Sequence, residues 1–322
     1  MKNMSLNEAF KGPRLSPAAE NMVQDIDPPF KIIGDERTQA RITDMINQIA
    51  VSETGRKTLE TASRAGYKIG MEFVLGSNGG CSKEHKQIVL SPLSKDDILV
   101  GVLIHEARHA GQFERGEYDA SDDRRPRRET LMTNIMRTRA VEADAQATAA
   151  QVLGEMMEAG NETPLFVFAR ANAAIGRAFN QAMYEDGALE NGKARTAAFL
   201  AWYENDPVKK AYDEAYQVEM MTRRAEKGLN AEDTYDRVQT PAQIVKDLCL
   251  DDKGGCYFTE NPSVLASGSY IAVDRDTASV LNGLMKTAAP ARKGNEGNLT
   301  PFTADMSKTL NPVFVQARKL SR

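Results

Sequence analysis

Hydrophobic residues recur with a helical period along most of the chain, and two short stretches between them have the composition of strands. Residues 35–65 place apolar side chains on one helical face, and residues 128–159 repeat that pattern over a longer segment. Residues 67–75 and 86–90 are rich in β-branched and aromatic types, which is typical of strands. We therefore predict an α+β fold that is predominantly helical, with a small antiparallel sheet beside one buried helix.

The buried helix is predicted just after the second strand. Residues 99–112, LVGVLIHEARHAGQ, are apolar on nearly every side of a helical wheel. Ser94, with Asp97 three residues later, predicts the N-terminal cap, and Gly111 predicts the end of the helix. A helix that is apolar all round belongs in the core of the domain.

The positions of prolines, and the places where the hydrophobic period is lost, predict three regions along the chain. Residues 1–35 contain four prolines and no sustained period, so we expect an extended N-terminal arm. Residues 36–225 hold the predicted strands and the strongest helical patterns, which predicts one domain. Residues 226–322 hold short helical patterns between turns, so we expect a C-terminal helical and irregular extension.

Two of the chain's three histidines lie in the predicted buried helix, four residues apart. His105 and His109 therefore fall on one helical face, where their ring nitrogens can reach one ion. Glu106 is rotated by about 100° from His105, so its carboxylate would lie beside that ion. This H-E-x-x-H arrangement supplies two zinc ligands and a general base for an activated water. The alternative is a buried helix whose histidines only satisfy local hydrogen bonds.

The long helical segment at residues 128–159 offers a third ligand. Glu142 projects near the centre of its apolar face, close to Leu131 and Ile135 on the wheel. A carboxylate in that position must be paired or bound to a metal, so Glu142 is the predicted third ligand. The alternative partner is a buried arginine or a water. Asp144 lies about 160° away, and we expect it either to support a ligand or to face solvent.

Two further residues and one basic run could be functional, but each also has a simple structural interpretation. His85 precedes the second strand, and we favour a surface-loop histidine because third ligands of such sites usually follow the helix. Tyr203 could stabilise an oxyanion with its hydroxyl, but packing in an aromatic cluster is the simpler prediction. The basic run at residues 124–128, RRPRR, could bind an acidic partner, and we favour a solvated loop.

Composition and charge narrow the possible partners and compartments. The formal net charge of −4 argues against a general nucleic-acid or membrane-surface binder. The first residues lack the apolar core of a signal peptide, and the longest apolar runs are too short for a membrane span. We therefore expect a cytoplasmic protein, with export by a non-classical route left open. Three cysteines fit a reducing compartment or one optional Cys249–Cys256 pair.

The strands, the H-E-A-R-H helix and the later R-A-V-E-A-D-A-Q-A segment together resemble the gluzincin branch of zinc metallopeptidases over residues 65–160. The pattern looks closest to the bacterial families described as "putative metallopeptidase domain". By this resemblance, His105 and His109 match the histidine ligands. Glu106 matches the catalytic base, and Glu142 matches the glutamate ligand. Residues 36–225 would then form a zincin-like metallopeptidase domain.

The chain departs from the related patterns at defined positions. Gluzincins often place an aspartate four residues after the ligand glutamate, and this chain has Gln146 there. If Asp144 takes the aspartate's part instead, the ligand position falls on Ala140, which cannot bind a metal. The metzincin motif would continue with glycine and histidine where this chain has Gln112 and Arg115, which excludes that branch.

The resemblance implies a hydrolase that uses one Zn²⁺ per chain to cleave a peptide or protein substrate, with Glu106 as general base. In such enzymes an edge strand beside the helix typically pairs with the substrate backbone. The alternative is a non-catalytic metal-binding or protein-interaction module on a zincin scaffold. We expect no nucleic-acid or membrane partner, and the sequence predicts no oligomeric state.

Overall fold

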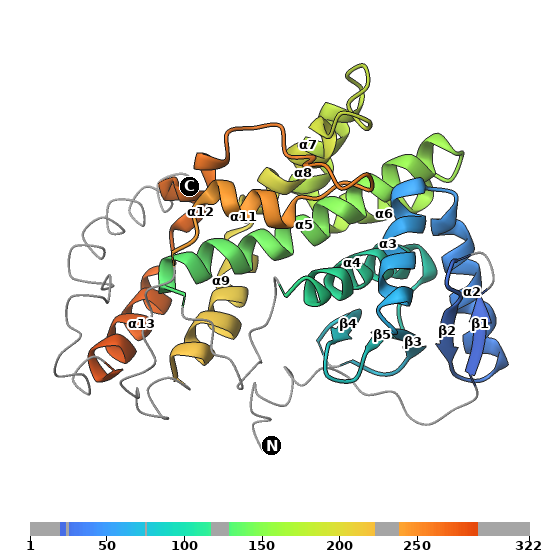
Figure 1. Cartoon of the computed structure of the whole chain (residues 1–322), viewed down its shortest axis with the longest axis horizontal. Helices are drawn as coiled ribbons and strands as arrows, with labels where there is room; N and C mark the ends of the chain where they lie inside the picture. The colour runs from blue at the N-terminus through green and yellow to red at the C-terminus, as the bar shows by residue number, and fades with distance from the viewer. Residues whose placement is uncertain (1–19, 24–25, 75, 117–128, 223–237, 289–322) are drawn as a thin grey trace. The chain divides into compact units, whose positions relative to one another are not determined.

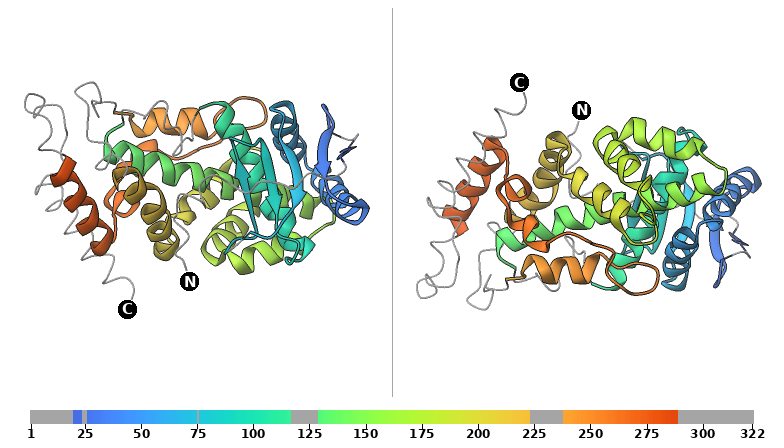
Figure 2. Two further views of the ribbon diagram at one scale, coloured as in Figure 1. Left: turned by 90° about the horizontal axis from the view of Figure 1, so that it is seen from below. Right: turned by 90° about the horizontal axis from the view of Figure 1, so that it is seen from above.

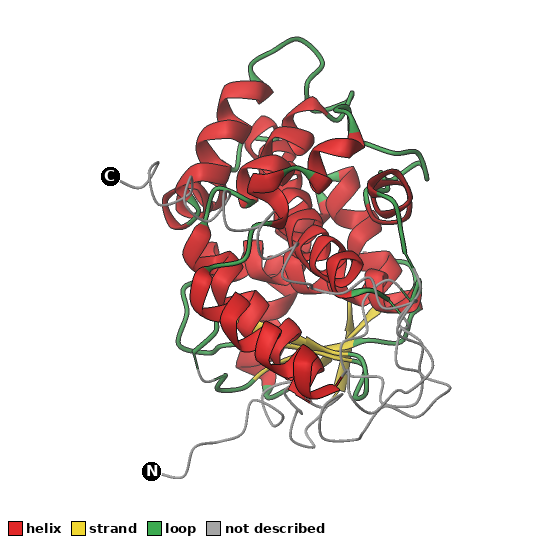
Figure 3. Cartoon of the chain, turned by 90° about the vertical axis from the view of Figure 1, so that its left-hand side faces the viewer, coloured by secondary structure: helices red, strands yellow, loops and turns green. Residues whose placement is uncertain are grey.

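The computed structural model describes residues 20–23, 26–74, 76–116, 129–222 and 238–288, and these residues form an α+β fold that is mostly helical (Figures 1 and 3). The described residues belong to two compact units that interleave along the chain. The first unit draws on Met1–Asp119, Val141–Glu204 and Leu248–Thr259, and the second on Ala120–Ala140, Asn205–Asp247 and Glu260–Arg322. The sequence predicts consecutive domains with boundaries at residues 35 and 225, whereas these two units interleave.

The first unit contains a five-stranded mixed sheet in the order β1-β2-β3-β5-β4. The strands are β1 (Glu20–Val23), β2 (Phe30–Ile33), β3 (Lys68–Met71), β4 (Gly79–Ser82) and β5 (Gln87–Leu90). The inner pairs β2–β3 and β3–β5 are parallel, whereas β1–β2 and β4–β5 are antiparallel. The predominantly helical α+β class is thus confirmed, but the expected antiparallel sheet is mixed.

The sheet differs from the prediction because three strands were not recognised in the sequence. Residues 79–82 lie in a glycine-rich stretch between the two predicted strands, and they form β4 and pair with β5. The chain therefore passes through β4 between the two predicted strands, which leaves β3 and β5 parallel. In the expected N-terminal arm, β2 buries Phe30 and Ile32 completely, and this burial draws β2 into the sheet beside β3.

Helices α2 (Glu36–Ala50), α3 (Glu53–Arg64) and α4 (Asp96–Glu114) pack on the sheet and on one another (Figures 1 and 2). The predicted apolar face of α2 is confirmed, since its buried residues are Ile42, Met45, Ile46 and Ile49. Side-chain caps start both of the first two helices. Asp35 accepts a hydrogen bond from the backbone N–H of Thr38, and Ser52 accepts one from that of Gly55.

Helix α4 has the predicted buried character, but its two ends differ from the prediction. Ser94 does not cap the helix, because its hydroxyl donates to the side chain of Asn78. Asp96 and Asp97 in the first turn instead favour the positive end of the helix dipole. The helix continues through Gly111 and ends before Gly116, whose φ of +71° is a left-handed conformation that suits glycine.

The long helix predicted from residues 128–159 is α5 (Leu131–Glu158). It is followed in the first unit by α6 (Thr163–Ala171), α7 (Ala173–Met183) and α8 (Lys193–Trp202). Helices α6 and α7 are separated at Asn172, whose φ of −121° and ψ of 63° are not helical. A segment of the chain far beyond these helices, Leu248–Thr259, also belongs to the first unit.

The second unit is helical in its described residues. It contains the beginning of α5, then α9 (Asp206–Tyr212), the π-helix η1 (Asp213–Val218) and most of α11 (Pro241–Leu248). The 3-10 helix η2 (Pro262–Ala266) and helices α12 (Gly268–Ile271) and α13 (Arg275–Ala288) complete it. Its core includes Ile135, Met221 and Leu281. Across the described parts of the chain, none of the helices has the length and apolar character needed to cross a membrane.

Glu155 of α5 holds the start of α3. Its carboxylate accepts hydrogen bonds from the hydroxyls of Ser52 and Thr54 at 2.5 and 2.6 Å, and from the backbone N–H of Thr54 at 3.2 Å. We expect Glu155→Ala to lower the free energy of unfolding by about 2–3 kcal/mol, because several donors lose their acceptor at once. Urea denaturation measures this loss.

Glu158→Ala is the matched control, because Glu158 is exposed on the last turn of the same helix. That variant should change the unfolding free energy by less than about 0.5 kcal/mol. Equal losses in the two variants would mean that the Glu155 hydrogen bonds do not fasten α3 to α5.

Candidate metal centre

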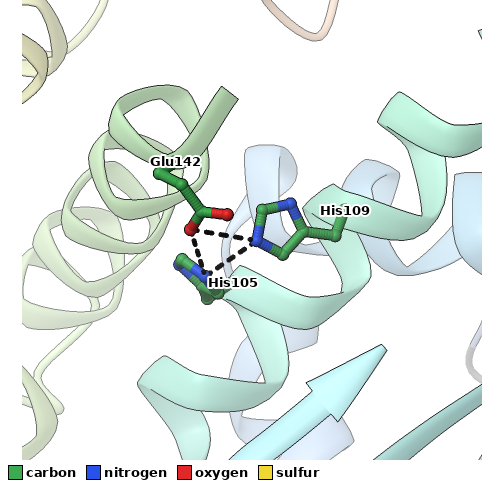
Figure 4. A group of neighbouring side chains, drawn as sticks. All are labelled: His105, His109 and Glu142. Atoms are coloured by element: carbon green, nitrogen blue, oxygen red, sulfur yellow. Dashed lines mark hydrogen bonds and ion pairs between the residues drawn. The ribbon is translucent and has the colours of Figure 1, made fainter. Parts of the chain in front are cut away.

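Three side chains from two helices converge on one point in the first unit. Helix α4 contributes His105 and His109, which its four-residue spacing puts on one face, and α5 contributes Glu142 (Figure 4). The Nε2 atoms of the two histidines lie 2.9 Å apart. The Oε2 atom of Glu142 lies 3.6 Å from Nε2 of His105 and 3.5 Å from Nε2 of His109. One ligand atom from each residue is within 4.8 Å of the others, so the trio could hold a metal ion.

The burial of this trio makes a cation at its centre physically reasonable. His105 and His109 are both buried, and the side chain of Glu142 is only 2 % exposed. Among the described residues, Oε2 of Glu142 has no hydrogen-bond partner. A buried carboxylate oxygen without a donor is costly unless a cation lies against it.

The separations of the ligand atoms also fit a small tetrahedral ion. Zinc bonds of about 2.0–2.1 Å at tetrahedral angles place neighbouring ligand atoms about 3.3–3.4 Å apart. The two distances from Glu142 to the histidines, 3.5 and 3.6 Å, are close to this value. The histidine nitrogens at 2.9 Å are closer together, so they would separate slightly around an ion.

Electrostatics within the trio favour opposite charges. Burial alone would lower the pKa of His109, but the charge of Glu142 and its contact with the ring outweigh burial and raise that pKa to about 9. Burial likewise disfavours the ionised form of Glu142. The neighbouring histidines overcome this and hold the pKa of Glu142 well below its ordinary range. The site is therefore arranged for an anionic carboxylate facing positive charge.

Glu106 lies directly beside the trio without joining it. Its side chain is largely buried, and burial raises the pKa of its carboxyl above the ordinary value. The charges of His105, His109 and Glu142 all act on that carboxyl, which shows how near it is to the three side chains. A carboxylate with a raised pKa, next to a possible ion, is suited to accepting a proton near neutral pH.

A buried hydrogen-bond chain continues from His109, and sequence analysis did not identify it. Nδ1 of His109 lies 2.7 Å from Oε1 of Gln112. The amide nitrogen of Gln112 donates to the carbonyl of Val141 at 3.0 Å and to Oδ2 of Asp144 at 2.8 Å. The position of Gln112, three residues after His109 on a buried helix, is a signal that could have indicated this contact.

Asp144 is the centre of a buried charge network and does not face solvent. It is 0 % exposed, and Arg108 donates to both of its oxygens, at 2.7 and 3.0 Å. Arg195 lies 3.6 Å from Oδ1, and the hydroxyl of Tyr257 donates to the same oxygen at 2.9 Å. Burial alone would raise the pKa of the Asp144 carboxyl, but Arg108 and Arg195 outweigh it and lower the pKa. Of the two roles considered for Asp144, the structure therefore favours support of a ligand.

The other candidates lie apart from the trio or outside the described residues. His85 is not among the residues that could hold the metal. Tyr203 packs in an aromatic cluster, with its ring centre 5.9 Å from that of Phe199 and 5.1 Å from that of Trp202. The basic run at residues 124–128 lies outside the described residues. The cysteines at positions 81, 249 and 256 are free thiols, so the optional Cys249–Cys256 pair is not formed.

The Asp144 network should contribute strongly to stability. Asp144→Asn leaves Arg108 and Arg195 without the carboxylate that they share, and we expect a loss of about 3–5 kcal/mol in the free energy of unfolding. Urea denaturation in the presence of a chelator measures this loss without any contribution from metal binding. Asp186→Asn, at an exposed position in the same unit, is the control. A loss below about 1 kcal/mol in Asp144→Asn would contradict a structural role for the shared charge.

Comparison with known proteins identifies the family. Residues 18–258 match the model of a family described as "Putative metallopeptidase family (DUF6782)". Searches among curated proteins and among solved structures return no match. The matched region covers most of the chain and includes α4, α5 and all three residues that could hold a metal ion. The chain therefore belongs to this putative metallopeptidase family.

Proposed function

We propose that the protein is a zinc-dependent peptidase that holds one Zn²⁺ per chain with His105, His109 and Glu142. The observation that carries this proposal is the buried convergence of two imidazole nitrogens and a carboxylate oxygen that lacks a hydrogen-bond donor among the described residues. Two histidines and a glutamate form one of the ligand sets of catalytic zinc sites, which keep a further position for water or substrate. Membership of a metallopeptidase family supports the same function.

Glu106 is the proposed general base and acid. When bound, zinc would lower the pKa of a water and polarise the scissile carbonyl. Glu106 accepts the proton of the water whose oxygen bonds to the carbonyl carbon. It then gives that proton to the amine nitrogen as the carbon–nitrogen bond breaks. The raised pKa of its buried carboxyl supports both steps, because the group must hold a proton between them.

The position of β4 supports a peptide as the substrate. Among the described strands, β4 lies at the edge of the sheet, with β5 as its neighbour, and it packs against α4. The backbone groups on the outer side of such a strand can pair with an extended peptide. A peptide bound there would run alongside the helix that carries His105, Glu106 and His109.

Metal analysis tests the ligands. The wild-type chain should bind about one zinc, whereas His105→Ala and Glu142→Ala should lose most of it, because each variant removes one of three ligands. His85→Ala is the matched control, since His85 is a histidine outside the trio, and it should retain the metal. Elemental analysis after dialysis against zinc gives the stoichiometry. A wild-type chain without zinc would overturn the proposal.

Activity measurement tests Glu106. Glu106→Gln should keep about one zinc and lose peptidase activity by at least about 100-fold, because the amide cannot accept the proton of the attacking water. Zinc-loaded wild type and variant are each incubated with a mixture of unfolded proteins, and mass spectrometry counts the new chain ends. Full activity in the variant would contradict the role of Glu106. If the zinc-loaded wild type cleaves nothing, the site is instead that of a non-catalytic metal-binding module.

A further inference from the structure

The orientation of the Gln112 side-chain amide follows from its neighbours. Gln112 is 0 % exposed, so each of its polar atoms has to find its partner inside the protein. On one side lie the carbonyl oxygen of Val141 and the carboxylate of Asp144, at 3.0 and 2.8 Å. A carbonyl oxygen and an ionised carboxylate are only acceptors, so the amide nitrogen has to face them. The amide oxygen is therefore directed at His109.

This orientation selects one tautomer of His109. The amide oxygen of Gln112 can only accept, so Nδ1 of His109, 2.7 Å away, has to carry the hydrogen. In the neutral ring, Nε2 is then left with its lone pair. That atom is the one that lies 2.9 Å from Nε2 of His105 and 3.5 Å from Oε2 of Glu142.

We propose that Gln112 is a positioning residue that fixes His109 in the tautomer and ring orientation that present Nε2 to the metal. The proposal rests on the metal site of the proposed function. Gln112 lies outside the H-E-x-x-H motif, so the motif itself does not indicate this role. The acceptor for Nδ1 of His109 is the side chain of Gln112, three residues later on the same helix. Partners of this kind fix metal-binding histidines and commonly change metal affinity when removed.

Asp144 extends this positioning to the segment Leu248–Thr259. The hydroxyl of Tyr257 donates to Asp144, and Arg108, which binds Asp144, also donates to the carbonyls of Leu248 and Leu250 at 2.9 and 3.1 Å. Because Asp144 receives the amide of Gln112, the segment is joined to His109 through three hydrogen bonds: Tyr257 to Asp144, Gln112 to Asp144, and His109 to Gln112.

Tyr257, at the end of this series of hydrogen bonds, is itself fixed by several contacts. Its carbonyl accepts from the hydroxyl of Thr196 at 3.1 Å, and the guanidinium of Arg195 lies 3.9 Å from the centre of its ring. The same carbonyl lies close to Gly192, where an added Cβ would be only 2.3 Å from the oxygen. Gly192 also has a φ of +82°, so both its backbone conformation and its close contact with Tyr257 favour glycine at this position.

Two substitutions of Gln112 separate its contact with His109 from its hydrogen bond to Asp144. Gln112→Met has a similar size but no polar atoms that accept from His109, so zinc affinity should fall about 10–100-fold. Gln112→Glu keeps an acceptor for His109, so zinc affinity should stay close to that of the wild type. Its thermal stability should fall, because the new carboxyl lies against Asp144. Zinc affinity is measured by competition with a chelator, and stability by thermal unfolding with the metal removed.

Gln151→Met is the matched control. Gln151 is also a buried glutamine of the first unit, and its amide donates to Glu155 and to the carbonyl of Leu189. Its replacement should lower stability and leave zinc affinity unchanged. Tyr257→Phe should reduce zinc affinity by less than Gln112→Met, because the hydrogen bond that it loses is two steps from His109.

Nuclear magnetic resonance of the zinc-loaded chain gives a readout that a purely structural role would not affect. The chain has only three histidines, so His85→Ala identifies the signals of His85, and sequential assignment along the backbone separates His105 from His109. In the wild type, His109 should bind zinc through Nε2 and carry a slowly exchanging hydrogen on Nδ1. In Gln112→Met that hydrogen should exchange rapidly with solvent, and in Gln112→Glu it should stay protected.

The outcomes distinguish this proposal from the proposed function. If the wild type binds zinc and Gln112→Met binds it equally well, with Nδ1 still protected, the positioning role is overturned and the metal site stands. Zinc bound through Nδ1 of His109 would also overturn it. If Gln112→Met does not fold, Gln112→Glu tests the positioning role. The proposal requires Nδ1 of His109 to be as well protected in Gln112→Glu as in the wild type, and loss of that protection would overturn it. A wild type that binds no zinc overturns both proposals.

Discussion

A carboxylate buried against two imidazoles is the constraint on which the first unit depends. Glu142 projects from α5 and is almost completely buried, and a charge there is unfavourable without compensation. The compensation comes from α4, whose four-residue spacing brings His105 and His109 to the same point. Each helix thus carries half of a site that neither could form alone, and the packing of α4 against α5 decides whether the site exists.

Helix α5 carries a second buried carboxylate, Asp144, and the charges of Asp144 and Glu142 are balanced by different partners. Asp144 is neutralised by the guanidinium of Arg108, with Arg195 nearby, so its charge is balanced by the protein itself. Among the described residues, the ion-pair partners of Glu142 are the two histidines, whose charge depends on protonation, and Oε2 of Glu142 has no hydrogen-bond partner there. A carboxylate balanced by arginines is a structural element, whereas one left with titratable partners is available to a cation. This difference explains why residues only two positions apart have separate roles.

The sequence predicts the parts of this arrangement that depend on local spacing. The H-E-x-x-H pattern requires only that one segment be helical, and Glu142 could be selected because it interrupts an apolar face. The spacing of Gln112 and His109 could have indicated their contact, but the roles of Arg108 and Tyr257 could not be selected in that way, because they depend on which elements meet in space. The sheet shows the same limit. Half of β4 is glycine, so its pairing comes from the backbone and from its neighbour β5, and no pattern of side chains predicts it.

The interleaving of the two units gives the segment Leu248–Thr259 an importance that its sequence does not suggest. Sequence analysis places this segment in a C-terminal extension, beyond a boundary at residue 225, whereas it packs within the first unit and carries Tyr257 to Asp144. The region matched by the family model ends at residue 258, just after Tyr257. A chain cut at residue 225 would keep both histidines and Glu142, yet it would lose the hydroxyl that donates to Asp144 and the carbonyls that bind Arg108. Because Asp144 accepts from the amide of Gln112, and Gln112 contacts His109, a piece of this protein that keeps all the surroundings of the proposed metal site has to extend past Tyr257.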